Sequence, residues 1–325
     1  MILALLRTGE VGYGGIAVVL RGAYYAGSLG GAGLAFFALL FGTRREVVDV
    51  WRMGRWAAGA ALLGIAAGFG ILTAQVGELM GGETVLDAEA WGVVLASRAG
   101  ASYGLGGVGL LLVASLALGP RSAAPGRAIV AAAGGVLACA SYVLLGHTTS
   151  LAPRPLPAAL LLIHLVVAAY WIGSLPPLAW AARQHGPEAA RLVEDWARMA
   201  AAAVPVLVAA GLLLAWWMLG GVGPLFGSWY GWALLAKVSL VAGLLALAAW
   251  HRFRLTPALT AGVPGAGERL ARSVTAEAVI ILLVLYAAAE MVSTSPDGLH
   301  GTAQIFDHGA RLRSFEILAE VAAAA

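Results

Sequence analysis

The chain has 325 residues, of which 61% are hydrophobic and 11% are charged, and its formal net charge is +3. Soluble proteins are about half apolar and a quarter charged, so this composition excludes a soluble globular domain and indicates an integral membrane protein. The basic residues are spread over short loops, which argues against a nucleic-acid-binding surface. The single cysteine, Cys139, excludes an intramolecular disulfide and a cysteine-cluster metal site.

Eight apolar runs follow one another along the chain, each long enough to cross a hydrocarbon core of about 30 Å. They cover residues 14–41, 56–77, 95–118, 128–146, 158–181, 198–219, 230–250 and 273–294. The runs are continuous and do not alternate with polar residues, which predicts helices and not barrel strands. The first run has no basic leader and no cleavage pattern, so we interpret it as a retained helix. We therefore expect an all-α polytopic membrane helix bundle with about eight transmembrane helices, forming one membrane domain over residues 1–325.

Glycines recur at a spacing of four within several runs, as at Gly27 and Gly31, Gly64 and Gly68, and Gly100 and Gly104. Small residues at this spacing let two helices approach closely in a membrane. We expect these positions to be helix–helix contacts.

The loops after the first, third, fifth and seventh runs hold 13 of the 20 basic residues. The loop after the second run is acidic, with Glu78, Glu83, Asp87 and Glu89. The positive-inside rule places the basic loops in the cytoplasm. Both termini are then expected to be periplasmic.

With that orientation, ionisable groups of six different runs fall in the periplasmic half of the bundle: Arg21, Arg98, His147, His164, Lys237 and Glu290. Charged and polar groups in a membrane are costly and usually face a water-filled cavity or a partner. We expect an outward-open polar cavity. Two alternatives remain, because the charged groups can also pair between helices or extend toward the interface, and a histidine can be a hydrogen-bonded core group.

Histidine is the commonest metal ligand, which makes His147 and His164 the candidate metal-binding residues. Thioether sulfur suits Cu(I), so methionines near the periplasmic ends of the runs are further candidates, although methionine in an apolar helix also serves for packing. The additional candidates, including two histidines of the C-terminal segment, are Met80, Met218, Met291, His300 and His308.

Several segments resemble one known family. Gly146-His147 is similar to a Gly-His motif, and His164 followed by Trp171-Ile172-Gly173-Ser174-Leu175 is similar to a His, Trp-x-Gly-Gly-Leu signature. The segments 230–237, 252–259 and 273–296 resemble the lysine-bearing helix, the helix exit and the last helix of the same family. This family is CopD, the bacterial inner-membrane copper resistance proteins. The chain departs from the pattern at Ser174, where glycine is typical, at His251, where asparagine is typical, and at Glu290, where the stretch is normally apolar.

The resemblance implies a multi-pass protein of the bacterial inner membrane that moves copper from the periplasm toward the cytoplasm. From the residues themselves we expect His147 and His164 to be the capture ligands, Lys237 and Glu290 to tune the charge of the cavity, and Arg21 and Arg98 to support it. A phosphate-binding loop is not found in the sequence, so transport would be passive or ion-coupled, and we expect a transporter-like or metal-binding protein and not an enzyme. The resemblance is clearest over residues 146–296 and weak over the first three spans. We therefore expect an N-terminal part (1–127), a CopD-like part (128–296) and a periplasmic tail (297–325). Expected partners are the lipid bilayer, a periplasmic copper-binding protein and other membrane subunits.

Two other functions remain open at this stage. The chain can be a membrane redox protein in which His147 and His164 bind haem, although their different expected depths do not suit one haem. It can also be a non-catalytic subunit whose glycine-rich helices pack against partners in a larger complex.

Overall fold

The computed structural model describes residues 13–82, 84–118, 124–145, 155–184, 186–219, 221, 223–227 and 229–293. Within these ranges the secondary structure is helical, with no strand. The eight long helices are α2 (Tyr13–Phe41), α3 (Val50–Leu79), α5 (Arg98–Ala114), α6 (Ala124–Ser141), α7 (Pro155–Ala182), α8 (Pro187–Leu219), α10 (Trp229–Trp250) and α12 (Ala266–Ser293). Shorter elements are α4 (Ala88–Ala96), η1 (Ser115–Ala117), η3 (Tyr142–Leu144), α9 (Gly223–Gly227), η5 (His251–Leu255) and α11 (Thr256–Thr260).

Eight segments of these helices are long and apolar enough to cross a membrane. The prediction of an all-α polytopic bundle with eight spans is therefore confirmed. Several helices extend further than the apolar runs do. For example, α8 begins at Pro187 and α12 at Ala266, whereas the corresponding runs begin at residues 198 and 273. A helix that leaves the hydrocarbon region keeps its backbone hydrogen bonds but takes polar side chains, so hydropathy underestimates its length.

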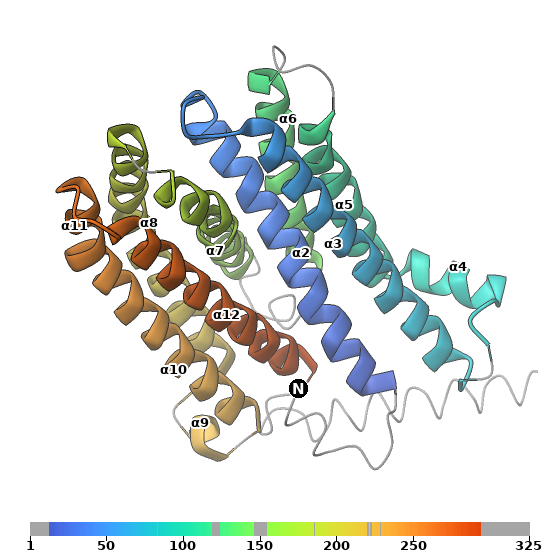
Figure 1. The fold of residues 1–325 in the computed structure, drawn as a ribbon. Coiled ribbons are helices and arrows are strands. Elements are labelled where there is room, and N and C mark those ends of the chain that lie inside the picture. Colours follow the sequence, from blue (N-terminus) through green and yellow to red (C-terminus); the bar gives the residue numbers. More distant parts are fainter. Residues whose placement is uncertain are drawn as a thin grey trace, which may run out of the picture.

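Successive long helices run in opposite directions (Figure 1). We call the end at which α2, α5, α7 and α10 begin the lower end, as drawn in Figure 1, and the opposite end the upper end. Side-chain caps define several helix starts. Asp49 accepts hydrogen bonds from the backbone N–H groups of Trp51 and Arg52 at the start of α3, and Ser97 accepts one from Gly100 at the start of α5. Because Ser97 is extended, it also separates α4 from α5.

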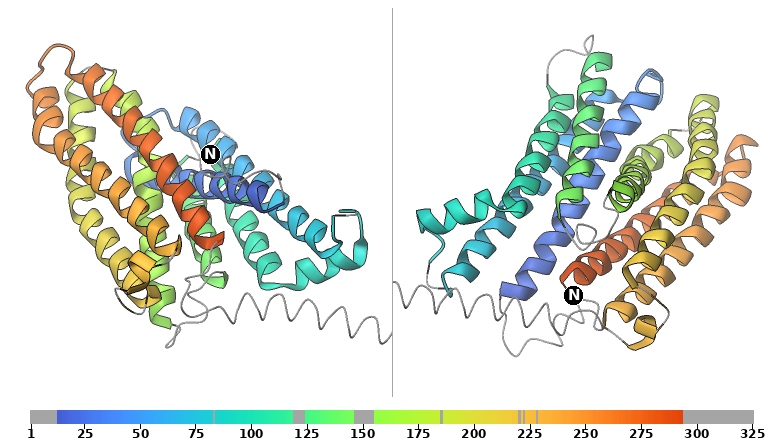
Figure 2. Two further views of the ribbon diagram at one scale, coloured as in Figure 1. Left: turned by 90° about the horizontal axis from the view of Figure 1, so that it is seen from below. Right: turned by 180° about the vertical axis from the view of Figure 1, so that it is seen from behind.

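The long helices form two groups (Figure 2). One group is α2, α3, α5 and α6, and the other is α7, α8, α10 and α12. Helix α2 joins the groups because it packs against α7 and α12 as well as against its own neighbours. It is the most buried of the spans, whereas α8 and α10 are the least buried.

Close helix contacts occur at glycines. A Cβ atom on Gly27 would lie 2.4 Å from the backbone nitrogen of Gly64, so α2 and α3 touch there as the spacing predicts. A Cβ on Gly33 would lie 1.7 Å from the carbonyl oxygen of Ala169 on α7. The expectation for Gly104 is wrong, because a Cβ there would have no neighbour within 4 Å. Gly104 faces away from the other helices.

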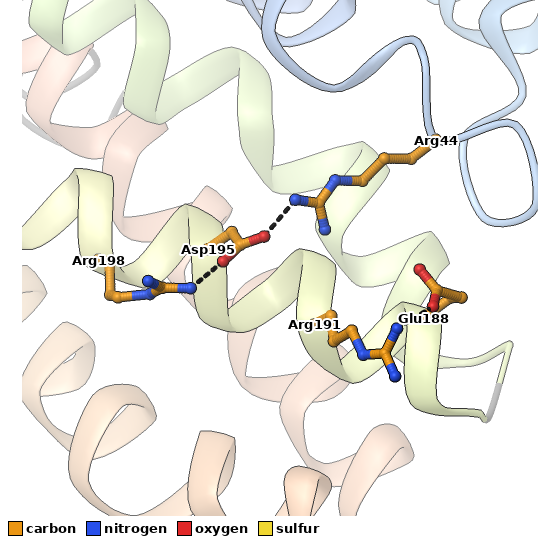
Figure 3. A network of polar contacts seen from close by, with 5 residues as sticks. All are labelled: Arg44, Glu188, Arg191, Asp195 and Arg198. Carbon is orange, nitrogen blue, oxygen red and sulfur yellow. Dashed lines mark hydrogen bonds and ion pairs between the residues drawn. The ribbon is translucent and has the colours of Figure 1, made fainter.

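Polar contacts at the upper end also join the two groups (Figure 3). Arg44, in the segment after α2, forms an ion pair with Asp195 of α8, and Asp195 also pairs with Arg198 on its own helix. The guanidinium of Arg52 on α3 lies 3.9 Å from the ring centroid of Trp180 on α7. The ion pair holds the upper end of α8 against the first group, and the Arg52–Trp180 contact joins α3 to α7.

Candidate functional site

His164 lies in the lower half of α7 and faces α8. Its Nδ1 atom is 3.0 Å from the carbonyl oxygen of Leu207. Gly211, one turn further along α8, leaves room for the ring, because a Cβ there would lie 3.0 Å from Cε1 of His164. A carbonyl oxygen only accepts hydrogen bonds, so Nδ1 carries the proton in this contact. In the neutral ring, Nε2 is then the unprotonated nitrogen, which is the form that binds a metal.

Lys237 of α10 is the predicted cavity residue that lies near His164, close enough for its charge to act on the imidazole. Both side chains are partly buried. Glu290 lies near the lower end of α12, where the hydroxyl of Tyr286 donates a hydrogen bond of 2.7 Å to its Oε1 atom. His164 of α7 and Lys237 of α10 are therefore within electrostatic range of each other.

The two predicted arginines lie in the other group of helices. Arg21 of α2 donates a hydrogen bond to the hydroxyl of Tyr103 on α5. Arg98 is exposed at the first position of α5. Arg21 therefore faces α5, whereas His164 faces α8.

Two of the three candidate methionines belong to one small apolar cluster. Met291 of α12 and Leu234 of α10 form its buried part, and Met218 of α8 packs against them. Met80 packs in a different cluster between α3 and α4. Of the remaining candidates, His147, His300 and His308 lie outside the described residues. Within the described residues, no three His, Cys, Asp or Glu side chains come together as a metal-binding group.

A buried polar cluster that sequence reasoning missed lies in the upper half of the second group. Glu277 of α12 is 1% exposed, and Trp171 of α7 donates its indole N–H to the Oε1 atom. The Nδ1 atom of His251 lies 3.2 Å from Oε2 of Glu277, an ion-pair distance, and its Nε2 atom lies 2.7 Å from the Oγ atom of Ser273. His251 is itself only 7% exposed.

The backbone around His251 is unusual. Residues His251–Leu255 form a π-helical turn, in which the N–H of Thr256 bonds to the carbonyl of His251 five residues earlier. Such turns insert one extra residue into a helix and are frequent at functional sites. The inserted residue lets the chain continue from α10 into α11 while the imidazole of His251 stays buried beside α12.

The cluster borders a cavity of about 260 Å³ between α7, α8, α10 and α12. Most of its wall is apolar, and Trp171, His251 and Glu277 supply polar groups. Pro205 lies in the middle of α8 and has no N–H group. The carbonyl of Ala201 therefore lacks its helical hydrogen-bond partner. Both Ala201 and Pro205 line the cavity.

A sequence signal for this cluster does exist. Glu277 is an acidic residue in an apolar run, and intramembrane acids are usually functional or paired. Its partner was not predictable, because His251 is 26 residues earlier at the end of another helix. Only the packing of α10 against α12 brings the two side chains together.

The fold and these sites define a multi-pass membrane protein with an eight-span helix bundle. Two family models match the chain: the model described as "Copper resistance protein D-like, N-terminal domain" matches residues 13–152, and "Copper resistance protein D" matches residues 190–291. Together they cover most of the chain, which therefore belongs to the copper resistance protein D (CopD) family. His251 and Glu277 lie inside the second matched range, whereas α7, with His164 and Trp171, lies between the two ranges. Comparison with curated proteins and with solved structures gave no match.

Proposed function

We propose that this copper resistance membrane protein moves copper from the periplasm toward the cytoplasm. Family membership supports copper as the substrate. The distribution of basic residues supports the orientation, because 13 of the 20 follow the spans that end at the upper end. On this proposal the upper end is cytoplasmic, both termini are periplasmic, and copper enters at the lower end.

The observation that carries the proposal at the residue level is the position of His164. Its Nδ1 atom is held by the carbonyl of Leu207, which keeps Nε2 available as a ligand. His147 is proposed as a second imidazole ligand from the sequence alone. The thioether groups of Met218 and Met291 supply soft donors nearer the lower end, consistent with Cu(I) as one form of the substrate.

Lys237 has a different role in this proposal. An ammonium group repels a metal ion, so a lysine within electrostatic range of His164 weakens binding there. A weak site suits transport, because an ion that binds too tightly does not leave. Glu290 at the lower end of α12 attracts the incoming cation, and Arg21 and Arg98 are proposed to support the polar entrance.

The test is copper uptake by proteoliposomes that contain the purified full-length chain. His164→Ala and His147→Ala are expected to lower the initial rate at least about tenfold, the range seen when a metal site loses a supporting group. Ile163→Ala is the matched control, because Ile163 precedes His164 on α7 and its side chain is exposed. Uptake that both histidine variants leave unchanged, at equal amounts of protein, would overturn the proposed roles of these residues.

A further inference from the structure

The His251–Glu277 pair is not used by the proposed entry site at the lower end. It is nevertheless a costly arrangement, because a carboxylate and an imidazole are both buried inside the bundle. The Oε2 atom of Glu277 accepts no hydrogen bond from the described residues and faces only Nδ1 of His251 at 3.2 Å. A positive charge on the imidazole therefore stabilises this carboxylate directly.

The surroundings of His251 fit two protonation states. Ser273 has a hydroxyl, which both donates and accepts hydrogen bonds. When His251 is an imidazolium, its Nε2–H donates to Oγ of Ser273, 2.7 Å away. When His251 is neutral with its proton on Nδ1, Ser273 donates to Nε2 instead. After loss of its proton, Nε2 therefore still has a hydrogen-bond partner in the Ser273 hydroxyl.

Other charged groups near the pair are few within the described residues. The cavity wall contains one more charged side chain, Arg252, whose guanidinium donates to the carbonyl of Ala197 at 3.4 Å. From α7 the pair is faced by the neutral Trp171, while the titratable Tyr170 packs toward Trp196 of α8. On α8, Asp195 and Arg198 flank the cavity residue Ala197 and pair with each other. Glu188 and Arg191 pair nearer the upper end, and Glu194 on α8 and Arg272 on α12 are exposed. On α2, which also packs against α12, Arg21 lies in the lower half and Arg44 follows the upper end of the helix and pairs with Asp195.

We propose that the His251–Glu277 pair binds the coupling proton and that copper moving toward the cytoplasm is exchanged for this proton. The inference rests on the function proposed above and adds the identity of the coupling ion. The protonated pair has no net charge, and release of the Nε2 proton leaves a net charge of −1 beside the cavity. A copper ion that reaches the cavity repels the imidazolium charge across a low-dielectric interior, so the ion and the proton occupy this region in turn. The carboxylate stays held by Trp171, and the proton leaves on the side of Ser273.

The experiment uses proteoliposomes with a pH-sensitive dye trapped inside, together with a parallel measurement of copper uptake. For the native chain, adding reduced copper outside is expected to raise the internal pH, with about one proton leaving for each Cu⁺ that enters if charge is conserved at the pair. An acidic interior is expected to increase the initial rate of copper uptake. Protein-free liposomes give the background for both signals.

Two variants separate the proton site from a structural role. Glu277→Gln keeps an amide oxygen for Trp171 but removes the charge. We expect copper-dependent proton release to fall to about a hundredth of the native value or less, because a positioned proton-transfer group contributes at least about a hundredfold. Ser273→Ala keeps the ion pair but removes the hydroxyl at Nε2, and we expect it to shift the pH profile of copper uptake. Thr275→Ala is the matched control, because its hydroxyl lies on the same helix and bonds only to the carbonyl of Ala271.

The possible results lead to different conclusions. If the native chain takes up copper without moving protons, or if Glu277→Gln and Ser273→Ala both behave like Thr275→Ala, the coupling site is overturned and the transport function stands. If the native chain takes up no more copper than protein-free liposomes, the transport function fails and the coupling role fails with it. Proton release that depends on Glu277, with a pH profile that depends on Ser273, supports the proposal.

Discussion

The hydroxyl of Ser28 on α2 both donates and accepts a hydrogen bond, and the second bond links α2 to η3. Its Oγ atom donates to the carbonyl of Tyr24 at 2.6 Å, so the hydroxyl of Tyr142, also 2.6 Å away, must be the donor in the second bond. Ser28→Ala removes the acceptor and leaves the Tyr142 hydroxyl unpaired, at a cost of about 1–3 kcal/mol. Tyr142→Phe leaves Ser28 bonded to Tyr24 and is expected to cost about 0.5–1.5 kcal/mol.

Thermal unfolding of the two single variants and the double variant in detergent tests this asymmetry. The double variant is expected to be no less stable than Ser28→Ala, because removing the tyrosine hydroxyl also removes the unpaired group. A larger loss for Tyr142→Phe than for Ser28→Ala would contradict the assignment of donor and acceptor.

At the scale of single residues, the sequence predicted some candidates better than others. Lys237 and His164 could be selected because each is an ionisable residue in an apolar run, but their proximity depends on how α10 and α7 are placed, which the sequence does not state. Glu277 is likewise an ionisable residue in an apolar run. Its pairing with His251 could not be predicted, because the π-helical turn that accompanies this buried histidine has no recognised sequence pattern.

Helix contacts at glycine provide a prediction at the scale of elements. Gly33 of α2 faces Gly173 of α7, and a Cβ on Gly33 would lie 1.7 Å from the carbonyl oxygen of Ala169. Both backbones would have to move, so Gly33→Ala is expected to cost at least about 1–3 kcal/mol. Gly30→Ala is the control one turn earlier, because a Cβ there has no neighbour within 4 Å. Since alanine favours a helix over glycine by about 1 kcal/mol, the control is expected to be neutral or stabilising.

The amount of folded, monodisperse protein and its unfolding temperature in detergent measure this difference. Equal unfolding temperatures for Gly33→Ala and Gly30→Ala would show that α2 and α7 are not in backbone contact at this level. The sequence predicted such contacts only in general terms, since a glycine in a helix gives no information about which neighbour it faces. Gly104, which faces open space, has the same spacing from Gly100 as Gly31 has from Gly27.

At the scale of the whole molecule, the number and order of the spans followed from hydropathy alone, because about 20 consecutive apolar residues have few alternatives to a membrane helix. The arrangement into two groups of four helices did not follow from hydropathy. It depends on which apolar helix surfaces pack against each other and which face lipid. The boundary expected at residue 127 stays a prediction. The two family models match residues 13–152 and 190–291.

The ion pair between Arg44 and Asp195 crosses from the first group of helices to α8, and it allows a test of how strongly the two groups are coupled. Both side chains are about 30% exposed, with values of 31% and 27%, so the pair is screened by solvent. Arg44→Ala is expected to cost about 0.2–1 kcal/mol, the usual range for exposed pairs. Asp195→Asn should cost more, because Asp195 also pairs with Arg198.

Unfolding temperatures measured at low salt and at 1 M salt distinguish an electrostatic contribution from a change in packing. At about 1 M salt the screening length is only about 3 Å, so the difference between native chain and Arg44→Ala is expected to shrink. Arg45→Ala is the matched control, because Arg45 is the next residue and is exposed. If Arg44→Ala and Arg45→Ala lower the unfolding temperature equally at low salt, this ion pair does not couple the groups. The packing of α2 against α7 and α12, and the contact of Arg52 with Trp180, would then still connect the groups.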